Sequence, residues 1–142
     1  MAIVPDESRA FLGKTGLAAQ NLYISLYTND QTPGSGAVVG SFTKSETNIG
    51  TGPAGNSNAC GTLFSGSWGG ANASGTYTAT QLSYGGTYSW TYNATTGTIY
   101  GYAISTGTGL TGTLAGAERF ATPQNITASG DKISVVVKLL TA

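Results

Sequence analysis

The chain has 142 residues, and its six basic and six acidic side chains give a formal net charge of +0. Only 8% of the residues are charged, against about 25% in an ordinary soluble domain. The length predicts one domain with a sizeable hydrophobic core. So few charges give weak repulsion between copies, and we expect partners or an ordered array to cover much of the surface. The alternative is a polar surface of Ser, Thr, Asn and Gly, which would explain the solubility of the chain but not its low number of charges.

Composition also argues against several classes of protein. The lysines and arginines are scattered, whereas a nucleic-acid-binding surface needs them clustered, so we expect no nucleic-acid partner. Cys60 is the single cysteine, which excludes a disulfide within the chain and is typical of folding in a reducing cytoplasm. The N-terminal residues do not form a signal-peptide pattern. No apolar stretch approaches the length of a membrane span, so we expect no membrane partner.

The first 20 residues predict an N-terminal arm. Asp6 is a candidate N-cap for a short helix that carries Phe11 and Leu12, but Gly13 interrupts this helix early. We expect a turn or two of helix, or an arm that lies on a neighbouring copy.

Strands and turns follow in the first half of the chain. Leu22 to Thr28 alternates aliphatic residues with tyrosine and serine, which predicts a strand with the aliphatic residues on one face and the tyrosines and serine on the other. Turn-forming residues are dense from Asn29 to Gly36. The predicted segments, in chain order, are strand 22–28, turn 29–36, strand 38–43, loop 47–58, strand 61–65 and a Gly-rich loop around Trp68.

The second half predicts further strands and two hairpins. Between Lys132 and Leu140 every second residue from Ile133 is apolar, which is typical of a strand with one wet face. Residues 93–97 predict a hairpin connection, and residues 107–116 predict a small Gly-Thr hairpin. The predicted strands are 76–82, 87–92, 98–105, 118–121 and 132–140.

This pattern of about seven to nine short strands predicts an all-β fold. We expect an antiparallel β-sandwich, jelly-roll-like, with a short N-terminal arm or helix. The expected organisation is an arm over residues 1–20 and a single β-sandwich domain over residues 21–142. Long Gly-rich loops of this kind often contact partners.

The sequence contains few residues that could support catalysis or bind a metal ion. The sequence has no histidine, which removes the commonest general base and metal ligand. The neighbours of Cys60 carry no charge that would stabilise a thiolate, so we expect an inert cysteine. The six carboxylates, without clustered spacing, are Asp6, Glu7, Asp30, Glu46, Glu118 and Asp131. We therefore expect no enzymatic activity, no metal and no cofactor; an uncharacterised enzyme is the third alternative.

Four charged residues have specific expectations. Asp131 lies in a predicted turn, where its carboxylate can bond to local backbone, and Asp30 suggests the same arrangement. Glu118 and Arg119 are adjacent on a predicted strand, so they would point to opposite faces of the sheet. We expect each of the two to pair across strands or across a subunit boundary.

Aromatic residues gather in one third of the chain, and they allow two interpretations. The simpler is core and cross-strand packing. If exposed, the rings would instead stack on sugars. Trp68 would either anchor into a neighbouring subunit or fold back on its own core. The clustered residues are Tyr77, Tyr84, Tyr88, Trp90, Tyr92, Tyr100 and Tyr102.

Several segments follow one another in a recognisable order. They are LYISLYTNDQTP (22–33), SFTKSE (41–46), an aromatic hairpin leading into IYGYAIS (99–105), AERF (117–120), Pro123 and GDKISVVVKL (130–139). Their order resembles a family of small tailed-phage virion proteins, from whose usual pattern Thr47 to Ser74 departs. The resemblance implies a structural component of the phage particle.

Within that family we expect a head decoration, or cement, protein that binds the major capsid protein and its own copies. Analogy with decoration proteins implies a homotrimer at capsid three-fold positions, in the virion after assembly in the host cytoplasm. The alternative is a tail-fibre or tail-tip module that binds host surface glycans. The candidate partner-contact residues are Ile3, Val4, Phe11, Leu12, Pro53, Trp68, Glu118 and Arg119.

Overall fold

Most of the chain folds as antiparallel β-sheet, which confirms the predicted all-β class. A computed structural model describes residues 2–3, 20–53, 59–64, 68–69 and 81–140, with side chains for 20–53, 59–64 and 86–137. Its strands are β1 (Ala2–Ile3), β2 (Leu22–Tyr27), β3 (Ile49–Thr51), β4 (Cys60–Leu63), β5 (Trp68–Gly69), β6 (Gln81–Tyr92), β7 (Gly97–Gly107), β8 (Thr111–Ile126) and β9 (Lys132–Leu140). The predicted helix around Asp6 lies outside the described residues.

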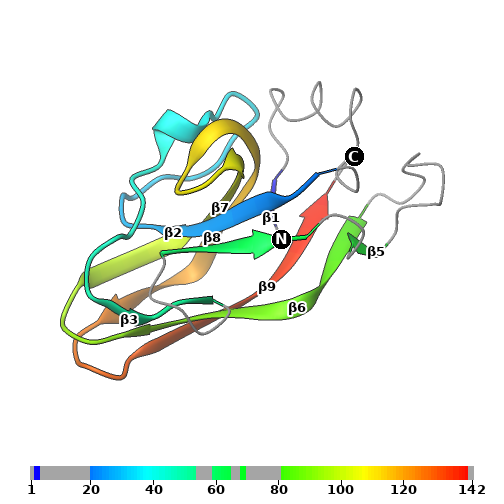
Figure 1. Ribbon diagram of the computed structural model, residues 1–142. Coiled ribbons are helices and arrows are strands. Elements are labelled where there is room, and N and C mark those ends of the chain that lie inside the picture. Colours follow the sequence, from blue (N-terminus) through cyan, green and yellow to red (C-terminus); the bar gives the residue numbers. More distant parts are fainter. Residues whose placement is uncertain (1, 4–19, 54–58, 65–67, 70–80, 141–142) are drawn as a thin grey trace.

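The strands form two layers (Figure 1). Neighbouring strands follow the order β3–β6–β9–β1–β8–β7–β2–β4, and β5 also pairs with β6. One layer therefore holds β4, β2, β7 and β8, and the other holds β3, β6, β9 and β5. The two-residue β1 lies between β8 and β9 and joins the layers. Its pairing with β9 is parallel, while the other described strand pairings are antiparallel.

The main hydrophobic core fills the space between the two layers. Aliphatic residues from β2 in one layer and from β9 in the other belong to the same buried cluster. In β9 the intervening residue Val136 is 56% exposed, as the period-two pattern predicts. The residues predicted to share one face of each strand are buried in this core, and they are Leu22, Ile24, Leu26, Ile133, Val135 and Val137; in β2, Ser25 and Tyr27 of the other face are buried as well.

Three aromatic side chains of β6 cross the sandwich with their polar tips satisfied. The Tyr88 hydroxyl donates to the carbonyl of Thr62 in β4, and Trp90 Nε1 donates to the carbonyl of Ala59 at 2.9 Å. The Tyr92 hydroxyl lies 3.1 Å from the Ser45 hydroxyl. Burial raises the pKa of Tyr92, and the Ser45 hydrogen bond offsets part of the rise. A buried ring with a bonded polar tip contributes both apolar area and specific geometry.

A second, smaller core lies on the outer face of the β2–β7–β8 layer. The segment between β2 and β3 folds over this face, so that Phe42 packs on Tyr27 with ring centroids 4.9 Å apart. The Tyr27 hydroxyl donates to the carbonyls of Gln31 and Glu118. Burial raises the pKa of Tyr27 to about 12. This layer is therefore covered on both sides (Figure 1).

The predicted strand over residues 38–43 is wrong, because this segment contains a 3-10 helix, Val39–Ser41. The N–H of Val38 donates to the Ser41 hydroxyl at 3.2 Å, and the N–H of Ser41 donates back to the Val38 carbonyl at 2.9 Å. Serine competes in this way for nearby backbone groups and favours a turn over an extended ladder.

The predicted loop over residues 47–58 is also wrong in part, since it contains β3. Ile49 is buried and pairs with Tyr92 of β6, while the preceding Asn48 adopts a left-handed φ of 60°. Likewise, the loop around Trp68 contains β5, which pairs with β6. One apolar residue among polar ones carries no strand period, so only the long-range contact with β6 could reveal β3.

Residues 93–97 do not connect a hairpin, contrary to the prediction. β6 ends in one layer and β7 begins in the other, so the connection crosses between layers. The N–H of Asn93 donates to the Asn48 carbonyl and the N–H of Thr96 to the Ile126 carbonyl, which fastens the connection to other segments. In contrast, the predicted hairpin within 107–116 is confirmed, with Gly107 opposite Thr111.

Replacing Gly61 with alanine should destabilise the fold by about 2 kcal/mol, a typical cost of overpacking. The added methyl carbon would lie 2.6 Å from the Tyr88 ring and 2.8 Å from Pro53, and Tyr88 is held by its hydrogen bond. Chemical denaturation would measure the change. Gly36→Ala is the matched control, since nothing lies within 4 Å of that position. Equal stability of the two variants would contradict the packing described.

Candidate partner-binding surface

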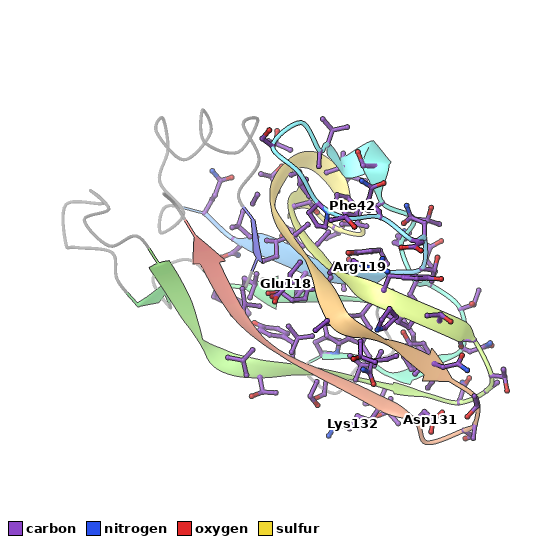
Figure 2. The ribbon with its side chains drawn as sticks, turned by 180° about the vertical axis from the view of Figure 1, so that it is seen from behind. Phe42, Glu118, Arg119, Asp131 and Lys132 are labelled. Atoms are coloured by element: carbon purple, nitrogen blue, oxygen red, sulfur yellow. The ribbon has the colours of Figure 1, made fainter. Side chains whose placement is uncertain are left out.

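Arg119 on β8 points to the loop-covered outer face. Its guanidinium pairs with the Asp30 carboxylate and lies 5.0 Å from the centroid of the Tyr100 ring. The ion pair joins β8 to the segment that covers this face, near Phe42 (Figure 2). The expected local turn bond of Asp30 is therefore replaced by a long-range pair. Arg119 is used within the chain and is only 28% exposed.

Glu118 points to the opposite side of β8, as predicted from its position next to Arg119. Its carboxylate accepts a hydrogen bond of 2.6 Å from the hydroxyl of Tyr102. Tyr102 is the cross-strand partner of Glu118 on β7 and is buried in the main core. The expected cross-strand pairing of Glu118 is thus confirmed, and its carboxylate lies at the side of the core that faces β9 (Figure 2).

A bulge in β8 opens a groove beside Glu118. Arg119 pairs with Gly101 and Gln124 pairs with Ile99, so residues 120–123 stand opposite Tyr100 alone. Bulges of this kind bend a strand away from its neighbours. The resulting groove has a volume of about 330 Å³ between β8 and β9. It is lined by Glu118, Phe120, Ala121, Thr122, Gln124, Lys132, Ile133 and Ser134.

The outer face of the β6–β9 pair differs from the covered layer. Cross-strand neighbours on this face carry short hydroxyl groups, and the hydroxyls of Ser89 and Ser134 are 2.9 Å apart. Val136 is the exposed apolar residue and Lys132 the charged one. Among the described residues, no segment packs over this face as the β2–β3 segment packs over the other. We call this surface the hydroxyl face; its side chains are Thr87, Ser89, Thr91, Lys132, Ser134 and Val136.

The predicted contact residues are distributed over several places. Ile3 lies in β1, where its backbone pairs with Ala117 and Leu140. Pro53 is buried beside Gly61 and Tyr88, within the chain's own packing. The backbone of Trp68 pairs with Tyr84, and its side chain lies outside the described set, as do Val4, Phe11 and Leu12. The structure therefore brings Glu118 together with the groove and places Arg119 and Pro53 in internal contacts.

Sequence reasoning missed most of the groove. Its apolar wall, Phe120 and Ile133, comes from two strands that do not pair with each other, and the groove lies where β8 bulges. Pro123 within an otherwise regular strand was the available signal, because proline in a strand marks an edge or a bulge. For Lys132 and Ser134 the sequence pattern predicted only a position on the solvent-exposed face of the strand.

The clustered aromatic residues pack mainly in the core, as the simpler interpretation predicted. Trp90, Tyr92 and Tyr102 are almost completely buried, and Tyr88 is partly buried against the core. The Tyr100 ring lies under Arg119. Tyr77 and the side chain of Tyr84 lie outside the described set. The described aromatic rings of this cluster therefore pack against other residues of the same chain.

Other reactive groups form no cluster in the described part of the chain. No group of three or more Cys, Asp, Glu or His residues there could hold a metal ion. Cys60 is half-buried and lines a second cavity of about 400 Å³, with the Lys44–Glu46 ion pair beside it. Within the same described residues, no helix is long and apolar enough to cross a membrane.

Comparison with models of known protein families, with curated proteins and with solved structures found no match for this chain.

Asp131 closes the turn between β8 and β9 at one end of the groove. Its Oδ2 accepts hydrogen bonds from the N–H groups of Thr127 at 2.8 Å and Ala128 at 3.0 Å, which confirms the predicted local bonding. These bonds favour the charged form and lower the pKa of Asp131 below its usual value. Gly130 precedes it with a left-handed φ of 95°, which glycine adopts without strain.

Asp131→Ala should lower the thermal unfolding midpoint at neutral pH. Because the pKa of Asp131 is lower in the folded state, its carboxylate stabilises the fold above the unfolded-state pKa, and this contribution is lost as pH falls through the folded-state pKa. The midpoint difference between wild type and variant should therefore shrink between about pH 5 and about pH 2. Thermal melts by circular dichroism would measure it, with Ser129→Ala in the same turn as control. A difference that stays constant with pH would contradict this role.

Proposed function

We propose that this chain is a tailed-phage virion protein that decorates the head, binding the major capsid protein and its own copies. The observation that carries the proposal is the hydroxyl face, an open sheet surface with an exposed valine and a single charged side chain. The opposite layer is covered by the chain's own loop, whereas no segment among the described residues packs over the hydroxyl face. The sequence resemblance to small phage virion proteins supports the same assignment.

The chemistry of the hydroxyl face suits repeated contacts of modest strength. Short Ser and Thr side chains form hydrogen bonds without the desolvation cost of buried ions. On a symmetric particle many such contacts act together, so each interface needs little energy. A homotrimer at capsid three-fold positions belongs to the same proposal, as does a location in the virion. Decoration would then cross-link neighbouring capsomers.

A jelly-roll-like classification of the sandwich is part of this proposal. Its support is that successive strands from β2 to β5 alternate between the two layers, and that β6 and β7 lie in different layers, while β5 and β6 pair within one layer. The β7–β8 hairpin within one layer is a departure from such alternation.

Labelling of the protein on purified particles, viewed by electron microscopy, tests the assignment directly. We expect label spread over the head in many copies. Label confined to the tail would overturn decoration and favour the alternative, a tail module that binds host glycans. That alternative needs accessible aromatic rings, and the described rings of β6 and β7 are mostly buried. Absence of label from every particle would overturn both.

Val136→Glu should reduce binding of the purified protein to particles that lack it, because it replaces the exposed apolar side chain of the hydroxyl face with a charge. Co-sedimentation at several protein concentrations would measure the loss, which we expect to be at least about tenfold for a buried unpaired charge. Val38→Glu is the matched control, since Val38 is 46% exposed but belongs to the segment that covers the other layer. Equal binding by both variants would exclude the hydroxyl face as the docking surface.

A further inference from the structure

An open gap, which we call the lane, lies between residues 118–124 of β8 and residues 132–138 of β9. β9 pairs with β6 along one edge, and its other edge pairs with β1 only at Leu139 and Leu140. β8 pairs with β7 and meets β1 at Ala117. Within the described residues, no strand pairs with the β8-facing edge of β9 from Lys132 onward to β1. An unpaired edge of this kind presents backbone N–H and carbonyl groups to an incoming strand.

β1 shows that the lane has the width of one strand. It pairs with both neighbours at once, which separates β8 and β9 there by two strand spacings, about 9.6 Å. The groove of about 330 Å³ lies in the same interval, between β1 and the turn closed by Asp131. A strand that entered the groove would therefore continue in line with β1.

The two walls of the lane differ in their ability to pair. The β8 wall is irregular, because residues 120–123 bulge and Pro123 has no N–H to donate. The β9 wall is regular, with an unbroken register against β6 from Lys132 to Val136. An incoming strand would thus bond to β9 and rest its side chains against Phe120 of β8, a partly buried apolar residue.

Two charged side chains line the groove, Glu118, whose carboxylate accepts a hydrogen bond from Tyr102, and Lys132. Lys44 pairs with Glu46, and Arg119 pairs with Asp30. Lys132 lines the groove and forms no ion pair within the described part of the chain. A carboxylate on the incoming segment would give Lys132 an ion-pair partner.

We infer that the lane between β8 and β9 binds an extended segment of a partner polypeptide, which adds to the edge of β9 in line with β1 and places an acidic side chain at Lys132. This is strand addition, in which backbone hydrogen bonds supply affinity and side-chain pockets supply specificity. The lane follows the edge of β9 and the hydroxyl face is its outer surface, with Lys132 and Ser134 belonging to both; the inference stands without the virion assignment.

The test uses the full chain and an acetylated, amidated hexapeptide of alternating threonine and valine with one central glutamate. Nuclear magnetic resonance would follow the backbone amides during titration. We expect shifts concentrated at residues 118–124 and 132–137, and an affinity about fivefold weaker when lysine replaces the glutamate of the peptide. A peptide N-methylated along one edge should not bind, since it lacks the donors that pair with β9.

Two variants locate the binding. Lys132→Glu should reverse the preference between the two peptides, and Ala121→Trp should fill the groove and abolish binding. Thermal melts check that each variant folds; if Ala121→Trp does not, Lys132→Glu alone decides. Thr87→Glu, on the β6 side of the hydroxyl face, should bind peptide normally, which separates this inference from the docking proposal. Absence of binding, or shifts outside the lane, would overturn the inference.

Discussion

Three aromatic side chains on one face of β6 hold the two layers of the sandwich together. Tyr88 and Trp90 reach across the core and donate to backbone carbonyls at the β4 side, while Tyr92 bonds to Ser45. Each ring buries a large apolar area, and each polar tip recovers the hydrogen bond that it would otherwise lose on leaving water. The tight approach of Tyr88 explains why a residue without a side chain, Gly61, stands beneath it.

Most of the charged side chains that the structure describes hold the chain's own segments in place. Asp30 and Arg119 join the covering segment to β8, Lys44 and Glu46 pair with each other, and Asp131 closes a turn. The covering segment packs over one layer, and no described segment packs over the hydroxyl face of the other. The low charge of the sequence thus follows from a surface in which hydroxyl groups, more than ions, face outward.

β8 and β9 connect the two proposed surfaces. β8 directs Arg119 toward the covered face and Glu118 toward the groove, because adjacent residues of a strand face opposite ways. β9 offers its open edge to the groove and its outer face, with Val136, to the hydroxyl face. A strand added to that edge would extend the β6–β9 layer, so a partner bound in the lane would also widen the hydroxyl face.

Features that depend on neighbouring residues along the chain could be predicted from the sequence alone. Alternation predicted β2 and β9 with their buried faces, adjacency predicted the opposite directions of Glu118 and Arg119, and turn chemistry predicted the bonding of Asp131. These features follow from the period of a strand and from local hydrogen bonds, which a short segment contains in full.

The pairing of the strands and the contacts between surfaces followed from the tertiary structure alone. That structure placed residues 93–97 between layers instead of in a hairpin, buried the isolated Ile49 as a strand against β6, and paired Asp30 with Arg119. It also opened the groove, which requires the β8 bulge and β9 to lie side by side. These outcomes depend on contacts between residues far apart in the chain, and a local pattern is the same whichever distant partner finally packs against it.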